Sequence, residues 1–144
     1  MLVGIASDHR GVNLKKKLVE HFENFKDYGT MTEDSVDYPV YAFKIGEDVR
    51  DKRIDFGILI CGSGIGMSIA CNKVKGVRCA KVNNAKEAEY TRNDNDANVM
   101  AISAELSDED AIKIVETFLN TPFSKLEKHQ RRINLITKYE ESNA

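Results

Sequence analysis

The stretch FGILIC, residues Phe56–Cys61, is followed at once by GSGIG, residues 62–66. A short, continuous apolar run bounded by turn residues is typical of a strand that is buried on both faces. A glycine-rich turn that leads into a helical pattern is typical of the connection in a βαβ unit. The stretch therefore predicts the strand and the turn on which a parallel α/β sheet is built.

Strand and helix patterns alternate on both sides of this stretch. The spacing predicts strands at 2–6, 26–28, 56–61, 77–82 and 99–102. It predicts helices at 12–25, 41–49, 67–72, 85–92, 107–119 and 123–139, followed by a polar tail at 140–144. Such alternation indicates an α/β fold with a parallel, doubly wound sheet covered by helices on both faces. No linker-like stretch interrupts it, so we expect one domain over residues 1–144.

Composition excludes several classes of partner. Lys and Arg total 21 and Asp and Glu total 23, and a net charge of −2 gives no basis for binding nucleic acid or an anionic membrane. The opening residues lack the pattern of a signal peptide and no window is apolar enough for a membrane span, so we expect a cytoplasmic protein. The three cysteines lack CxxC spacing and the three histidines are scattered, which argues against a disulfide framework and against a metal centre.

The ligand crevice of a parallel α/β sheet lies beyond the carboxyl ends of its strands. The loop Gly62-Ser63-Gly64-Ile65-Gly66 falls at such a place, where backbone amides can bind an anion. It matches neither the GxGxxG dinucleotide fingerprint nor the Gly-Lys-Ser/Thr end of a Walker loop. A phosphate-binding loop and a plain tight turn both remain open on this pattern.

Two further candidates follow strands at the same edge. Cys61 precedes the glycine loop, where amides and a helix dipole would stabilise a thiolate that could act as a nucleophile or a base. Asp8 and His9 follow the first strand, and a carboxylate beside an imidazole can move protons on sugar hydroxyls. The alternatives are that Cys61 is a buried thiol and that Asp8 caps the next helix.

A basic face is predicted on the last helix, formed by Lys125, Lys128, His129 and Arg132. Such a face is usually solvated. Lys128 and Arg132 are i,i+4 neighbours, however, and could hold a phosphate together. The run Lys15-Lys16-Lys17 is interpreted as solvated surface.

Four segments together resemble type B ribose-5-phosphate isomerase, a family that also contains the galactose-6-phosphate isomerase subunits. They are Ser7-Asp8-His9-Arg10-Gly11, Asp37-Tyr38-Pro39, the stretch from Cys61 to Lys73 (CGSGIGMSIACNK) and Asn95-Asp96-Ala97-Asn98-Val99. The match runs from residue 1 to about residue 139, in matching order and spacing. The resemblance implies a Rossmann-like three-layer α/β/α sandwich and metal-free aldose–ketose isomerisation of a sugar phosphate without a cofactor. It also implies a homodimer, or a dimer of dimers, whose active sites combine residues of two subunits.

Carried over residue by residue, the resemblance implies a role for each candidate. Cys61 would be the base that moves a proton between C1 and C2 through an enediolate, and Ser63 would contact the reacting oxygens. The amides of Gly62, Ser63, Gly64, Ile65 and Gly66 would stabilise the oxyanion. The remaining substrate-binding residues would be Asp8, His9, Asn95, Lys128 and Arg132, of which Asp8 and His9 would also assist ring opening.

The sequence departs from the family pattern at four positions. Asp94 occupies the place of the usual histidine, the acid that opens the furanose ring, and Glu105 that of a common phosphate-binding arginine. Lys128 replaces an arginine and loses its bidentate fork. Arg10 replaces a small residue and could restore a cation near the crevice.

Three functions are therefore compatible with the sequence. The first is interconversion of ribose 5-phosphate and ribulose 5-phosphate, with Cys61, Ser63, Asp94 and His9 as catalytic residues. The second is isomerisation of a six-carbon sugar phosphate of the allose or galactose 6-phosphate type. The third is a sugar-phosphate sensor that has lost turnover through its changes at Asp94 and Glu105.

Overall fold

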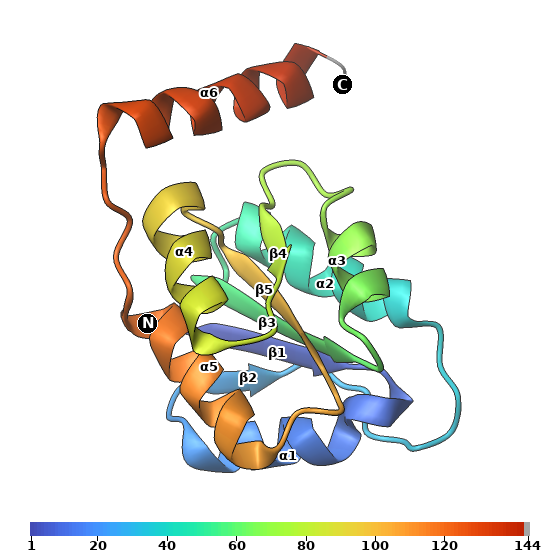
Figure 1. Cartoon of the computed structure of the whole chain (residues 1–144). Helices are drawn as coiled ribbons and strands as arrows, with labels where there is room; N and C mark the ends of the chain where they lie inside the picture. Colours follow the sequence, from blue (N-terminus) through green and yellow to red (C-terminus); the bar gives the residue numbers. More distant parts are fainter. Residues whose placement is uncertain (143–144) are drawn as a thin grey trace.

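The computed structural model describes residues 1–142 and contains one five-stranded sheet. Its strands are β1 (Val3–Ser7), β2 (Phe25–Asp27), β3 (Phe56–Cys61), β4 (Cys79–Lys81) and β5 (Val99–Ser103). They lie in the order β2-β1-β3-β5-β4, and every pair of neighbours is parallel (Figure 1). The parallel, doubly wound sheet predicted from the sequence is confirmed.

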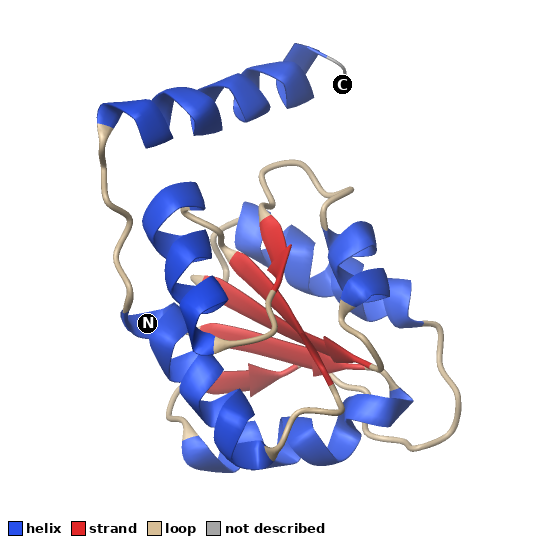
Figure 2. Cartoon of the chain, in the orientation of Figure 1, coloured by secondary structure: helices blue, strands red, loops and turns tan. Residues whose placement is uncertain are grey.

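Helices cover both faces of the sheet, as Figure 2 shows. One apolar cluster joins the sheet to α1 (Val12–His21), α4 (Ala85–Asn95) and α5 (Asp108–Asn120), and a second joins it to α2 (Tyr38–Arg50) and α3 (Ile65–Cys71). The strands β1, β3 and β5 are almost entirely buried because both clusters contact them. This is the three-layer α/β/α sandwich that the resemblance implies.

Strand register brings three strand ends to one level. Ser7 of β1 pairs with Ile60, and Cys61 of β3 pairs with Ser103 at the end of β5. The chain turns from β1 outward to β2 and then back across β1 to β3, so the order of the strands reverses between β1 and β3. Ligands of doubly wound sheets bind at such a switch point.

Several element boundaries differ from the predicted ones for local reasons. Helix α1 ends at His21 rather than at residue 25, and Asn24 takes a positive φ of 63° before β2 begins. Helix α2 begins at Tyr38 rather than at residue 41, because Pro39 is well suited to the first turn of a helix. Strand β4 is shorter than the predicted 77–82, and β2 begins one residue earlier than predicted. Helix α5 starts as predicted, since the Ser107 hydroxyl accepts from the Asp110 amide.

The interpretation of Lys15 as solvated surface is wrong. Its side chain is fully buried, and Nζ donates to both carboxylate oxygens of Asp27 at 2.7 and 2.8 Å. The neighbouring Lys16 and Lys17 are exposed, as expected. The buried pair ties α1 to the edge strand β2, because Asp27 is the last residue of that strand.

The last helix, α6 (Glu127–Ser142), stands apart from the sandwich and lies near the end of α4 (Figure 1). It starts later than the predicted residue 123, because Lys125 takes a positive φ of 61° that interrupts helical geometry. It continues through residues 140–142, which were predicted as a polar tail, and residues 143–144 lie outside the described part of the chain.

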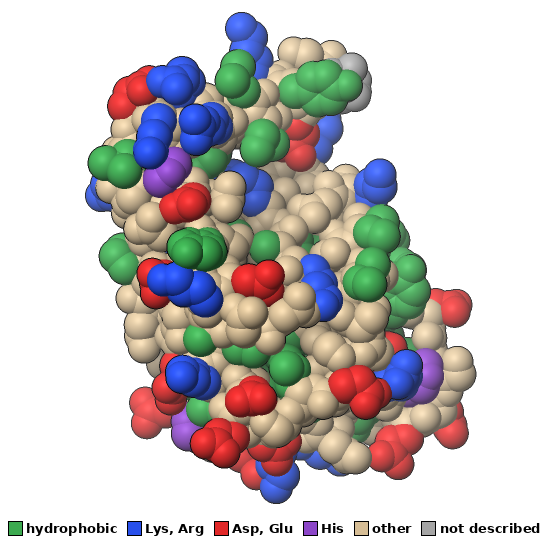
Figure 3. All heavy atoms as spheres, viewed as in Figure 1, with side chains coloured by type: hydrophobic (Ala, Val, Ile, Leu, Met, Phe, Trp, Pro, Cys, Tyr) green, Lys and Arg blue, Asp and Glu red, His purple; other side chains and the backbone are tan. Residues whose placement is uncertain are grey.

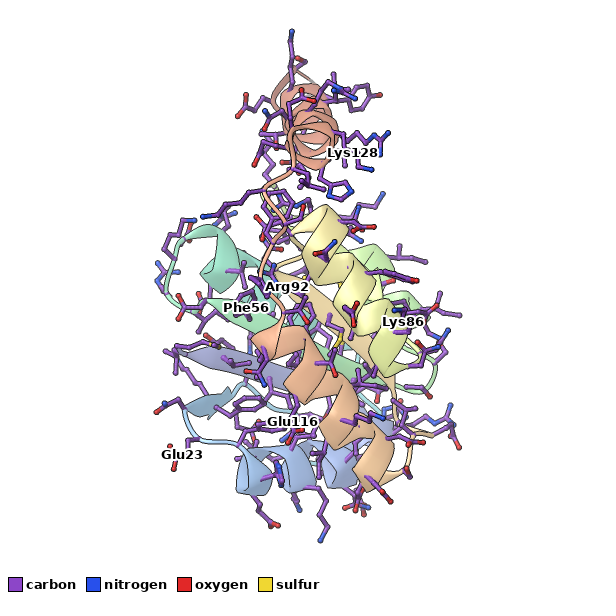
Figure 4. The ribbon with its side chains drawn as sticks, turned by 60° about the vertical axis from the view of Figure 1, so that its left-hand side comes forward. Glu23, Phe56, Lys86, Arg92, Glu116 and Lys128 are labelled. Carbon is purple, nitrogen blue, oxygen red and sulfur yellow. The ribbon has the colours of Figure 1, made fainter. Side chains whose placement is uncertain are left out.

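Arg92 fixes the start of the segment that leads to α6. Its guanidinium donates to the Thr121 carbonyl at 3.2 Å and to the Ala97 carbonyl at 2.8 Å. The same group lies 4.8 Å from the ring centre of Phe56, and Figure 4 shows the two side chains side by side between α4 and the sheet. The end of α4 and the first residues after α5 are therefore held together.

Candidate active site at the switch point

The side chain of Cys61 lies at the end of β3 and is only 5% exposed. Its Sγ accepts a hydrogen bond from the Gly64 amide at 3.2 Å. The Gly64 N–H is thus directed at the sulfur from within the loop that follows it. The prediction that Cys61 lies beside the loop amides is confirmed for the amide of Gly64.

The loop can place that amide because Gly64 adopts a left-handed conformation with φ of 82°. A Cβ at this position would lie 3.0 Å from the backbone carbonyl carbon of Ile102 on β5. Both features require glycine, since other residues rarely adopt such a φ and the neighbouring backbone cannot move aside cheaply. Strand β5 therefore constrains the turn that orients the Cys61 sulfur.

The Ser63 hydroxyl is exposed and accepts from the Ile65 amide at 3.1 Å. Two amides of the loop, those of Gly64 and Ile65, thus donate to side chains of the loop itself in this structure. The loop is also tied to the end of β5, because the Ser103 hydroxyl donates to the Gly62 carbonyl at 2.7 Å. The oxyanion role of the five loop amides stays a prediction.

Asp8 and His9 lie at the same edge, after β1. The Asp8 amide donates to the Ile60 carbonyl at 3.0 Å, which joins the end of β1 to β3. The Asp8 carboxylate accepts from the amides of Arg10 and Gly11, so the capping role that we left open is present. Nδ1 of His9 accepts from the Val36 amide at 3.3 Å, which leaves Nε2 as the protonated nitrogen of a neutral ring.

Tyr38 also belongs to this site, although the sequence assigned it no role. A Cβ on Gly66 would collide with its ring, so the tyrosine at the start of α2 lies directly on the glycine loop. The only signal in the sequence was its position in the motif Asp37-Tyr38-Pro39.

The structure does not bring Asp94 and Asn95 to this edge within one chain. They end α4, which leads into the start of β5, whereas Cys61 lies where β3 ends. The Asp94 carboxylate accepts from the Asn93 side chain at 2.7 Å, and its side chain is 42% exposed. These two residues face α6 instead of the glycine loop.

His129 of α6 meets Asp94. Its Nε2 lies 3.8 Å from the Asp94 Oδ1, and its Nδ1 is 2.8 Å from the Ser124 hydroxyl. The imidazole is only 12% exposed, so the contact between α4 and α6 holds it in place. The sequence showed His129 only as part of the basic face of the last helix.

Lys128 and Arg132 are exposed on α6, and they lie on neighbouring turns as predicted. Lysine and arginine side chains gather over the first half of this helix (Figure 3). Figure 4 shows Lys128 well above the sheet. The predicted site residues therefore form two groups, one around Cys61 and one around α6.

Among residues 1–142, no group of three or more His, Cys, Asp or Glu side chains is arranged to hold a metal ion. Within the same residues, no helix combines the length and apolar character needed to cross a membrane.

This arrangement is that of a doubly wound α/β domain with a thiol-containing site for a small molecule at its switch point. A family model described as Ribose/Galactose Isomerase matches residues 3–136. The chain belongs to this Ribose/Galactose Isomerase family.

Individual relatives agree with that membership. Ribose-5-phosphate isomerase B of Clostridium thermocellum superposes with a TM-score of 0.96 at 38% identity, over 100% of both chains. Ribose-5-phosphate isomerase B of Mycoplasma genitalium, solved with bound ribulose-5-phosphate, gives 0.91 at 42% identity, over 96% of this chain and 95% of the other. Ribose-5-phosphate isomerase B of Mycolicibacterium paratuberculosis is 34% identical over 99% of this chain and 94% of its own length.

The geometry at Gly64 yields a prediction about stability. Gly64→Ala should destabilise the fold by about 1–3 kcal/mol through its positive φ, with a further loss from the clash with the Ile102 carbonyl. Gly76→Ala is the matched control, because Gly76 has a φ of 83° but nothing nearer than 3.8 Å to an added Cβ. Urea unfolding of both variants measures the difference. Equal losses would mean that β5 does not constrain the loop.

Proposed function

We propose that this chain interconverts ribose 5-phosphate and ribulose 5-phosphate through an enediolate, with Cys61 as the base. The thiolate would take the proton from C2 of the open-chain aldose and return it to C1, while a proton passes between O1 and O2. The observation that carries this proposal is the hydrogen bond from the Gly64 amide to a nearly buried Cys61 sulfur, beside Asp8 and His9. Membership of the Ribose/Galactose Isomerase family supports it.

The remaining roles follow the same proposal. Ser63 and the amides from Gly62 to Gly66 would contact the reacting oxygens. Asp8 and His9 would hold the sugar, with the Nε2–H of His9 available as a donor. The proposed steps use no cofactor and no metal. The cytoplasmic location that we expect from the sequence stays a prediction.

We also propose a homodimer in which α6 and the end of α4 complete the site of the neighbouring subunit. Within one chain, Asp94 and Asn95 lie at the end of α4 and Lys128 and Arg132 lie on α6, whereas Cys61 lies at the end of β3. Apolar side chains are exposed on α3, next to Cys61, and on α6. Ile65 and Ile69 of α3 are 53% and 58% exposed, and Leu135 and Ile136 of α6 are 62% and 54% exposed. Pairing these surfaces would bury them and bring cations to the crevice.

A coupled assay on a panel of five- and six-carbon sugar phosphates distinguishes the three functions left open by the sequence. We expect turnover of ribose 5-phosphate above that of allose 6-phosphate and galactose 6-phosphate. Preference for a six-carbon substrate would keep the chemistry and change the sugar. Binding of sugar phosphates without any turnover would instead identify a sensor.

Cys61→Ala should lower kcat by about 10²- to 10⁴-fold, the usual contribution of a positioned acid or base, while a sugar phosphate still binds. Cys79→Ala is the control, because this thiol lies in β4 rather than at the end of β3. Initial rates and calorimetric titration measure the two effects. Full activity of Cys61→Ala would refute the mechanism, because the proposal assigns the proton transfer between C1 and C2 to this thiol.

A mixing experiment tests the shared site. Cys61→Ala and Arg132→Ala protomers, each inactive alone, should recover about one quarter of the wild-type sites after random exchange, because half of the dimers would carry one intact hybrid site. Mixing Cys61→Ala with Ser63→Ala should recover nothing, since both changes fall in the same half of the site. Subunit exchange is verified with differently tagged protomers. Absence of recovery in the first mixture would place Arg132 outside a shared site.

The proposal also requires an acid that protonates the furanose oxygen and so opens the ring of ribose 5-phosphate. A carboxyl group in water is ionised at neutral pH and donates no proton, whereas imidazole titrates near neutrality. We therefore propose that His129, oriented by Asp94 and Ser124, supplies the proton to the furanose oxygen. Ribulose 5-phosphate needs no such step, because its phosphorylated O5 cannot close a furanose ring.

His129→Asn should slow conversion of cyclic ribose 5-phosphate by about 10²-fold or more and largely spare conversion of ribulose 5-phosphate to the free, open-chain aldehyde. Initial rates measured in both directions provide the comparison, and Asp94→Asn should show the same asymmetry more weakly. His9→Asn is the rival variant. If only His9→Asn slows conversion of ribose 5-phosphate more than conversion of ribulose 5-phosphate, then His9 is the acid and His129 with Asp94 is not.

A further inference from the structure

An ion pair crosses the carboxyl end of the sheet near Cys61. Arg10 lies in the short turn after β1, and its Nη2 donates to Oε1 of Glu105, in the turn after β5, at 2.7 Å. Strand β3 lies between β1 and β5 in the sheet, so the pair crosses over the end of β3. The side chains are 57% and 73% exposed and therefore lie at the protein surface.

The guanidinium of Arg10 rests on the glycine loop. A Cβ at Gly62 would collide with the guanidinium, so the close approach depends on glycine at the position that follows Cys61. Glu105 is tied to the same loop, because its amide donates to the Ser103 hydroxyl at 3.0 Å and that hydroxyl donates to the Gly62 carbonyl. Arg10, Glu105 and the loop thus form one connected group.

Arg10 differs in charge from the other ionised side chains in the segments that follow β1, β2, β3 and β5, because those side chains are carboxylates. These segments are residues 8–11, 28–37, 62–64 and 104–107. They carry five carboxylates, at Asp8, Glu33, Asp34, Asp37 and Glu105, and one permanently charged cation, Arg10. An edge of this composition would repel a phosphate dianion unless a cation screened it.

We propose that Arg10 binds the phosphate of the substrate, and that it leaves Glu105 when the phosphate enters. An exposed ion pair contributes little to stability, so its carboxylate is easily replaced. A phosphate dianion can accept two hydrogen bonds from the planar guanidinium, whereas Glu105 accepts one through Oε1 in this structure, and the dianion carries the larger charge. The inference rests on the proposed function in taking a sugar phosphate as the ligand, and it adds a subsite on the same subunit as Cys61.

Inorganic phosphate is the probe, because it reports on the subsite without any turnover. Its dissociation constant is measured by isothermal titration on the full chain for wild type, Arg10→Gln, Arg10→Lys, Glu105→Gln and Arg50→Gln. Arg50 is the matched control, since it is an exposed arginine in an ion pair with Asp51, on the far end of α2. Thermal unfolding of each variant confirms that it folds.

Loss of one charge-assisted hydrogen bond predicts a dissociation constant about tenfold higher in Arg10→Gln, with Arg10→Lys intermediate and Arg50→Gln unchanged. Glu105→Gln should bind phosphate about threefold more tightly, because it removes the competing carboxylate. In the isomerase assay, Arg10→Gln should raise KM in the same proportion as the dissociation constant and change kcat less than about threefold.

Equal phosphate affinity in wild type and Arg10→Gln would refute the phosphate subsite. Weaker or unchanged binding in Glu105→Gln would refute the exchange, because Glu105 would then position Arg10 or have no influence on it. A chain that binds phosphate through Arg10 but does not isomerise ribose 5-phosphate would refute the proposed function and leave the subsite intact. If the chain isomerises ribose 5-phosphate but Arg10→Gln leaves the affinity for phosphate unchanged, the phosphate subsite is refuted and the proposed function stands.

Discussion

The position of the Cys61 sulfur depends on one backbone turn. Gly64 takes a left-handed conformation, its amide points back at Cys61, and the Ile102 backbone leaves no room for a Cβ at this position. The sheet enforces this geometry because β3 and β5 are paired in register, with Cys61 opposite Ser103. The same pairing brings the Ser103 hydroxyl to the Gly62 carbonyl. A buried, amide-bound thiol at the edge of the sheet is thus a consequence of strand register and one glycine.

The strand ends were predictable from the sequence because their chemistry follows from topology. An apolar run such as Phe56–Cys61 indicates a buried parallel strand, and residues that follow parallel strands meet at one edge. This places Asp8, His9 and Cys61 together with no knowledge of packing. The core of the sheet was predicted for the same reason, since continuous apolar strands have few alternatives to burial.

The features that sequence reasoning missed depend on contacts between distant elements. Lys15 lies in a lysine run that resembles solvated surface, and only the position of Asp27 at the end of β2 explains its burial. The contact of His129 with Asp94 requires α6 to lie against α4, and that placement depends on the left-handed turn at Lys125 and on the bonds of Arg92. Periodicity is a local signal and carries no information about such contacts.

The charges of the crevice show how substitutions can be coupled through one glycine. The resemblance to type B ribose-5-phosphate isomerase implies an arginine where this chain has Glu105 and a small residue where it has Arg10. The structure joins these two positions directly across Gly62, at 2.7 Å. The cation that the resemblance implies after β5 lies in this chain after β1, on the other side of the same loop. A phosphate bound over Gly62 would meet a guanidinium in either arrangement, but in this chain it would also meet a carboxylate. Under the proposed exchange, an anion displaces Glu105 before Arg10 binds it, so the phosphate would be held less tightly than by an arginine without a carboxylate partner.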